Sequence, residues 1–119
     1  MTLLNTEVAV VGGGMVGGAL ALGLAQQGFD VTVIEQAAPP AFDTASKPDV
    51  RISAISAASV DLLRGLGVWE AVQAMRAHPY SRLETWEWEN AHVSFDAAEL
   101  KLPRLGYMVE NNVLQLALW

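Results

Sequence analysis

The sequence predicts an α/β fold that opens with a parallel βαβ unit, and three observations carry this prediction. An apolar, β-branched run at residues 7–11 is typical of a buried strand, and a second such run lies at residues 31–35. Between them, residues 15–27 are rich in Ala and Leu and predict a helix about 20 Å long. Gly28 follows where a helix C-terminal cap belongs. Two strands joined by one helix should form a right-handed crossover.

Composition and charge narrow the classes of partner. The chain has 119 residues and a formal net charge of −6. A negative balance argues against nucleic acid and anionic lipid as main partners, because both select basic surfaces. The absence of cysteine excludes disulfides, thiolate metal ligands and cysteine nucleophiles, and it fits a reducing compartment. His78 and His92 lack the spacing of metal ligands, so we expect no metal site.

The uncharged stretch from Val8 to Phe29 is long enough to raise the question of a membrane span. Glycines interrupt it, and a glycine triplet near its start is incompatible with one continuous helix. No Lys or Arg precedes it, so the basic region of a signal peptide is missing. A buried strand followed by a helix packed on a sheet accounts for the apolar character. The interrupting glycines are Gly12, Gly13, Gly14, Gly17, Gly18 and Gly23.

The rest of the chain predicts a long loop and several short elements. Residues 36–50 contain three prolines and read as a loop, and Ser56 is a plausible N-cap for the helix that follows. The later elements expected are a helix to residues 65–67, a helix at 68–77, a strand at 82–89, a turn at 90–91, strands at 92–95 and 106–109, and a helix at 111–119.

Two tryptophans mark the predicted strand at residues 82–89. Alternation along a strand places Trp86 and Trp88 on the same face. Aromatic side chains in such a row more often pack in a core or an interface than stack on a ligand ring, and we favour that role here.

Gly12, Gly14 and Gly17 form a G-x-G-x-x-G motif that directly follows the first expected strand and opens the helix. Gly12 permits the tight turn, Gly14 lets a pyrophosphate approach the backbone, and Gly17 lets the helix pack close to the strands. The N–H groups at the helix start, at Met15 and Val16, then favour the phosphate charge. This context predicts a Rossmann-like dinucleotide site. The alternative is that the glycines serve turns and packing only.

Glu35 ends the second expected strand and is the acid of this motif. Its carboxylate can accept hydrogen bonds from both hydroxyls of an adenosine ribose. The same negative charge repels a 2′-phosphate, which disfavours NADP as the resident ligand. The motif and its acid do not by themselves separate FAD from NAD.

Two later segments, DVRISAIS at residues 49–56 and ETWEWE at residues 84–89, resemble the flavoprotein aromatic hydroxylases, specifically their ubiquinone-biosynthesis branch. The resemblance extends to the glycine segment GGGMVGGALALGLAQQGFDVTVIE and to LGYMVENNVLQLAL, and so covers essentially the whole chain. It implies an FAD-dependent monooxygenase that is reduced by NAD(P)H. Through a flavin hydroperoxide, such an enzyme hydroxylates the ring of a polyprenylated benzoquinol.

The resemblance also implies site residues beyond the first motif. Arg51 would lie along the flavin side of the cofactor, and a guanidinium suits a pyrophosphate or flavin oxygen. The alternative for Arg51 is an ion pair with Asp49 or another nearby acid. Ser53 and Ser56 either bond cofactor oxygens or serve turn and cap roles. The expected cofactor contacts are Gly12, Gly14, Met15, Val16, Gly17, Glu35, Arg51, Ser53, Asn111 and Gln115.

An incomplete, discontinuous domain is a further implication of the resemblance. Residues 1–119 would form the N-terminal part of an FAD-binding domain, with about 80–105 belonging to the start of a substrate-domain sheet. The last expected helix stops without a cap, which looks like a cut chain. We therefore expect the chain alone to be inactive and to bind FAD weakly or not at all. Its exposed apolar faces should also make it dimerise.

Two other functions share the first motif. An NAD-dependent Rossmann oxidoreductase would place a third βα unit soon after Glu35, where this chain has a proline-containing loop and DVRISAIS. A non-catalytic dinucleotide-binding fragment would keep the fold without the ligand. The resemblance itself implies a polyprenylated quinol substrate and other ubiquinone-biosynthesis proteins as partners. It also implies a cytoplasmic location, or a peripheral one at the inner membrane.

Overall fold

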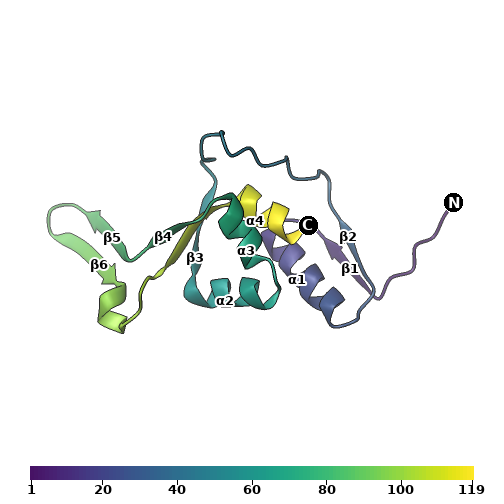
Figure 1. The fold of residues 1–119 in the computed structure, drawn as a ribbon, viewed down its shortest axis with the longest axis horizontal. Coiled ribbons are helices and arrows are strands. Elements are labelled where there is room, and N and C mark those ends of the chain that lie inside the picture. Colours follow the sequence, from purple (N-terminus) through teal and green to yellow (C-terminus); the bar gives the residue numbers. More distant parts are fainter.

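The N-terminal part of the chain folds as the predicted βαβ unit in the computed structural model, which describes residues 1–119 (Figure 1). β1 (Val8–Val11) and β2 (Val31–Ile34) pair in parallel. α1 (Met15–Gln26) joins them and packs against β2. The uncharged stretch is thus divided between a strand, a turn and a helix. No helix of the structure combines the length and the apolar character needed to cross a bilayer.

The C-terminal end of α1 is capped by the backbone alone. Gly28 has a φ of +92°, in the left-handed region that glycine adopts without strain. Its N–H donates to the carbonyl of Ala25 (3.0 Å), and the N–H of Phe29 donates to the carbonyl of Leu24 (3.2 Å). These two bonds form a Schellman motif, which satisfies carbonyls at the helix end. The cap predicted at Gly28 is therefore confirmed, and it turns the chain directly into β2.

A second, antiparallel sheet has the strand order β3–β7–β4. Its members are β3 (Ile52–Ser56), β4 (His78–Tyr80) and the central β7 (Gly106–Glu110). The sequence predicts β7 but neither of its neighbours. Pro79 lies in the edge strand β4, where a missing N–H is tolerated. None of these strands joins the parallel pair, so the third βα unit expected of an NAD-dependent oxidoreductase is not present.

Three helices pack beside this sheet, close to their predicted ranges: α2 (Ala57–Gly65), α3 (Trp69–Met75) and α4 (Asn111–Leu118). Ser56 caps α2 as predicted, because its Oγ accepts a first-turn backbone N–H at 3.3 Å. The main core lies between these helices and β7. It consists of Val60, Leu63, Val68, Trp69, Val72, Tyr107, Val109, Val113, Leu114 and Leu118.

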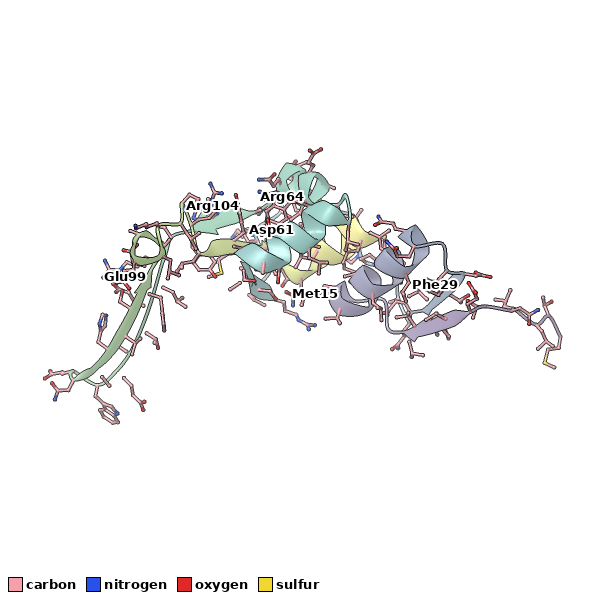
Figure 2. The ribbon with its side chains drawn as sticks, turned by 90° about the horizontal axis from the view of Figure 1, so that it is seen from below. Met15, Phe29, Asp61, Arg64, Glu99 and Arg104 are labelled. Carbon is pink, nitrogen blue, oxygen red and sulfur yellow. The ribbon has the colours of Figure 1, made fainter.

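β5 (Arg82–Glu87) and β6 (Ala91–Asp96) form a separate antiparallel hairpin. The hairpin projects from the end of the molecule opposite the N-terminus (Figures 1 and 2). A short 3₁₀ helix, η1 (Ala97–Leu100), then leads the chain back toward β7. The hairpin lies away from the core helices and contributes little to the core.

The predicted end of the first hairpin strand is wrong. The turn covers residues 88–90 rather than 90–91, and Trp88 has a φ of +58°, outside the extended region. Trp86 and Trp88 therefore do not share a strand face. Their exposed fractions are 69% and 84%, so neither belongs to a core within this chain.

Candidate functional site

The glycine turn between β1 and α1 has a backbone path that only glycine allows at two positions. Gly12 has a φ of +105°, and its N–H donates to the Ile34 carbonyl of β2 at 2.8 Å. A Cβ on Gly17 would lie 1.9 Å from the carbonyl oxygen of Gly12. Such a contact is far inside van der Waals distance. The turn and packing roles predicted for Gly12 and Gly17 are therefore confirmed.

Gly14 differs, because neither its conformation nor its surroundings require glycine. It is the N-cap of α1, with φ −71° and ψ −169°, an extended conformation open to any residue. A Cβ there would meet no atom within 4 Å. The N–H groups of Met15, Val16 and Gly17 belong to the first turn and have no intrahelical partner. No side chain caps the helix either, so these groups are left free. Free N–H groups beside empty space form a favourable position for an anionic group.

Glu35 lies directly after β2 and binds the same turn. Its Oε2 accepts the N–H of Gly13 (2.6 Å), and its Oε1 accepts the N–H groups of Gln36 (2.8 Å) and Ala37 (3.2 Å). These bonds, first that from Gly13 and then that from Ala37, hold the pKa of Glu35 below its ordinary value. The carboxylate is therefore negative at neutral pH, as a ribose-binding acid must be.

A polar cavity of about 360 Å³ opens beside Gly14. The start of α1, the loop before β3 and the N-terminal half of α4 meet there. Five of the predicted cofactor-binding residues line it, although they come from distant parts of the sequence. The lining residues are Gly14, Met15, Pro40, Asp49, Arg51, Asn111, Asn112 and Gln115.

The Arg51 side chain is free to bind a ligand. It is exposed, and it takes part in none of the ion pairs of the structure. The Asp49 carboxylate instead accepts the backbone N–H of Arg51, at 3.3 Å from Oδ1. The alternative of an Arg51–Asp49 ion pair is therefore wrong. An unpaired guanidinium on the wall of a cavity is suited to a phosphate or flavin oxygen.

Ser53 and Gln115 hold groups that surround the cavity. The Oγ of Ser53 donates to Oδ1 of Asn111 at 2.5 Å, which orients the Asn111 side chain, although Ser53 does not line the cavity itself. The Nε2 of Gln115 donates to the carbonyl oxygen of Gly13 at 2.9 Å. The start of α4 is therefore tied both to β3 and to the glycine turn.

An ion pair that the sequence did not indicate holds the loop of residues 36–50 over the cavity. The Arg76 guanidinium donates to Oε2 of Glu110 (3.1 Å) and to the carbonyl of Ser46 (2.8 Å), and it lies 5.0 Å from the centre of the Phe42 ring. The other oxygen of Glu110 accepts the N–H of Asp49 at 2.8 Å. The partners lie at the C-cap of α3, on β7 and in the loop, so no local sequence pattern could reveal the contact.

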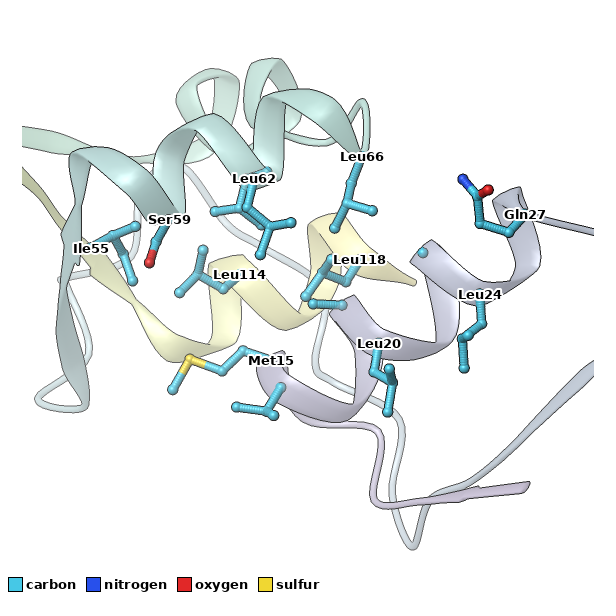
Figure 3. A pocket seen from close by; sticks show the side chains of 14 residues that line it. Met15, Leu20, Leu24, Gln27, Ile55, Ser59, Leu62, Leu66, Leu114 and Leu118 are labelled. Carbon is cyan, nitrogen blue, oxygen red and sulfur yellow. The ribbon is translucent and has the colours of Figure 1, made fainter. Parts of the chain in front are cut away.

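A larger hollow on the other side of α1 is apolar. This groove, of about 630 Å³, runs between α1, α2 and α4 (Figure 3). Leu20 and Leu62 line it and remain largely exposed, at 54% and 59%. Val16 lines the same groove, so any part that Val16 plays in the polar cavity is limited to its backbone N–H.

Comparisons with known proteins match the chain to an FAD-binding domain and to part of two ubiquinone-biosynthesis enzymes. A family model described as FAD binding domain matches residues 5–115. The 3-demethoxyubiquinol 3-hydroxylase of Escherichia coli is 79% identical over 119 residues, which are 100% of this chain and 30% of that protein. The ubiquinone biosynthesis monooxygenase COQ6 of Danio rerio is 33% identical over 118 residues, with 94% of this chain and 24% of that protein covered. The chain therefore spans at most about a third of these relatives.

Solved structures share the fold at low sequence identity. PqsL of P. aeruginosa, in complex with 2-aminobenzoylacetate, has a TM-score of 0.69 at 19% identity over 95% of this chain and 29% of that chain. The p-nitrophenol 4-monooxygenase PnpA from Pseudomonas putida has a TM-score of 0.67 at 20% identity over 99% of this chain and 28% of that chain. At these identities the likeness shows the fold alone. The family match and the glycine turn agree with it, and the chain belongs to the FAD-binding domain family.

Proposed function

We propose that the chain supplies the FAD-binding N-terminal part of a monooxygenase that hydroxylates a polyprenylated benzoquinol ring in ubiquinone biosynthesis. The names of relatives 79% and 33% identical to it support this reaction. The segments DVRISAIS and ETWEWE support the same branch. FAD, when bound, would supply the redox chemistry, using NAD(P)H and O2, while the protein binds and orients the reactants.

The observation that carries the proposal is the empty space at Gly14 beside the polar cavity. Neither the backbone nor the packing demands glycine there. A ligand that approaches the backbone closely accounts for the missing side chain. The N–H groups at the start of α1 would donate to its pyrophosphate, and Glu35 would accept the ribose hydroxyls.

The other side of the cavity would hold the flavin end of the cofactor. Arg51 offers a cation with fixed geometry, and the amides of Asn111 and Gln115 can both donate and accept hydrogen bonds. Ser53 keeps Asn111 oriented. These groups position the cofactor, and none of them is assigned an acid–base step.

A chimera tests the function directly. This chain would replace the matching segment of the Escherichia coli relative, to which it is 79% identical. We expect the chimera to hold FAD and to hydroxylate 3-demethoxyubiquinol. Gly14→Ala in the chimera should lower its flavin content. Gly65→Ala is the matched control, because a Cβ at Gly65 also meets no atom within 4 Å but lies on α2, away from the cavity.

A wrong substrate and a wrong FAD site would give different results in the chimera. A chimera that holds FAD but leaves the quinol unchanged contradicts the proposed substrate. A colourless chimera contradicts the FAD site itself. The 119-residue chain alone should not hydroxylate the quinol and should bind FAD weakly, because it spans 30% of that relative. Turnover of a quinol analogue by the chain alone would show this expectation to be wrong.

The same proposal assigns partners to the surfaces that the chain leaves uncovered. The hairpin of β5 and β6, within residues 80–105, would start a substrate-domain sheet. When the chain is alone, a second copy would cover the exposed apolar faces, as a homodimer. A polyprenylated quinol resides in lipid, so the cytoplasmic protein would contact the inner membrane peripherally, beside other ubiquinone-biosynthesis proteins.

A further inference from the structure

The end of α4 holds the middle of the glycine turn through two hydrogen bonds. The carbonyl oxygen of Gly13 accepts Nε1–H of Trp119 (2.8 Å) and Nε2–H of Gln115 (2.9 Å). The N–H of Gly13 donates to Oε2 of Glu35 at 2.6 Å. Gly13 is buried, so both of its backbone polar groups are satisfied by side chains from other parts of the chain.

Trp119 also accounts for glycine at position 13. A Cβ there would lie 2.9 Å from Cζ2 of Trp119 and 3.1 Å from Cβ of Glu35. The space beside Gly13 is therefore already filled. The Trp119 side chain is itself 57% exposed, so it adds little to the core. Its one polar group, the indole N–H, is directed at Gly13.

Fixing the Gly13 carbonyl also fixes the next N–H. The peptide between Gly13 and Gly14 is planar and trans, so the N–H of Gly14 points opposite to the Gly13 carbonyl. Gly14 lines the polar cavity, whereas Trp119 does not. Consecutive glycines rotate their peptides with little steric cost. With fewer donors on the Gly13 carbonyl, this peptide would be held less firmly and the direction of the Gly14 N–H would be less fixed.

We propose that Trp119 is a positioning residue for cofactor binding, which holds the Gly13 carbonyl and thereby presents the Gly14 N–H to a pyrophosphate. This inference rests on the proposed FAD site. Gln115 shares the same carbonyl but also lines the cavity. Trp119 does not line that cavity, although it lines a second hollow together with Glu35, so its effect on a pyrophosphate beside Gly14 passes through Gly13.

Trp119→Phe removes the indole N–H and keeps an aromatic ring against Gly13. Trp86→Phe, in the exposed hairpin, is the matched control. NMR on the wild-type chain and both variants would follow the amide signals of Gly13 and Gly14, the titration of the Glu35 carboxyl and the Kd for FAD. NMR titration also measures weak binding. Urea denaturation of the three proteins separates a local change from a loss of stability.

Trp119→Phe should unfold at nearly the same urea concentration as the wild type and shift the Gly14 amide signal. Its Glu35 pKa should rise, because the Gly13 N–H is held less firmly against the carboxylate. Its FAD affinity should fall roughly three- to tenfold, the range of one neutral hydrogen bond. Trp86→Phe should change none of these quantities.

An unchanged Gly14 signal together with unchanged FAD affinity in Trp119→Phe overturns the proposal. A wild-type chain whose signals do not respond to FAD agrees with the expectation that the chain alone binds FAD weakly or not at all. In that case the NMR signals of the ligand-free chain still test the role of Trp119. A shifted Gly14 signal and a raised Glu35 pKa support the positioning role, and two unchanged values overturn it.

Discussion

At the scale of single residues, four neighbouring glycines answer four different physical demands. Gly12 supplies a positive φ, and Gly17 makes room for the carbonyl of Gly12. Gly13 makes room for the Trp119 ring, while Gly14 leaves open space on the cavity wall. Three of these demands come from within the chain. The fourth, at Gly14, is assigned to the proposed ligand, so substitutions at these positions should separate folding from binding.

Gly17→Ala should destabilise the chain while Gly14→Ala should not. The added methyl at position 17 would lie 1.9 Å from a backbone oxygen, so the turn and α1 must move apart. We expect a loss of about 1–3 kcal/mol, since better helix propensity offsets only part of the strain. Gly14→Ala should change stability by less than about 0.5 kcal/mol. Urea denaturation measures both, and equal midpoints for the two variants would contradict the packing role of Gly17.

The charge on Glu35 predicts a pH dependence of stability. Hydrogen bonds from Gly13 and Ala37 lower the pKa of Glu35 in the folded state. A lowered folded pKa stabilises the fold above the unfolded pKa, and this contribution is lost as pH falls through the folded value. The wild type should therefore have a higher free energy of unfolding than Glu35→Gln at neutral pH. This difference should shrink as the pH falls below about 4.3, the ordinary pKa of a Glu side chain. Glu89→Gln, in the hairpin turn, is the control, and a constant difference for Glu35→Gln would refute the expectation.

At the scale of elements, local patterns predict elements whose boundaries are set by nearby residues. The glycines around α1 and the Ser56 cap of α2 are of this kind, and both are confirmed. β3 and β4 were not predicted, because they are defined by pairing with β7, far along the chain. The end of β5 was misplaced because Trp88 takes a left-handed conformation that tryptophan rarely adopts.

The residues and contacts around the polar cavity also include some that the sequence predicts and some that it does not. The glycine motif and the family resemblance indicated five of the eight residues that line it, because both depend on short segments. The Arg76–Glu110 ion pair and the bond from Trp119 to Gly13 were not predicted. Each of these joins segments that only the folded chain brings together, and neither has a spacing that could identify it.

Arg76 should be more important for stability than an arginine in a surface ion pair. Arg76→Met leaves the carboxylate of Glu110, which is 7% exposed, with the N–H of Asp49 as its remaining partner. We expect a loss of about 1.5–3 kcal/mol, as for other hydrogen bonds to charged groups. Arg64→Met is the control, because Arg64 and Asp61 form an exposed pair, and it should cost less than about 1 kcal/mol. Equal urea midpoints for the two variants would show that the pair does not hold the loop.

At the scale of the whole molecule, the fold is more extended than a compact domain of its length. The radius of gyration is 17.5 Å, whereas about 13.5 Å is typical for this number of residues. Only 17 of 119 residues are buried. Figure 2 shows the cause, since the hairpin and the N-terminal segment extend from opposite ends of the helical part. Much apolar surface, in the groove and on the hairpin, is therefore left in water.

Large exposed apolar surfaces favour association, so the chain in solution should form dimers in a concentration-dependent way. If the groove between α1, α2 and α4 is the contact, Leu20→Lys with Leu62→Lys should return the mass to that of a monomer. Trp86→Lys with Phe95→Lys on the hairpin should then leave the dimer intact. All four side chains are more than half exposed, at 54%, 59%, 69% and 54%, so neither pair should unfold the chain. Light scattering over a range of concentrations measures the mass. A wild-type chain that stays monomeric at every concentration would exclude self-association. A dimer that is lost only in the hairpin variant would show that the dimer contact lies on β5 and β6.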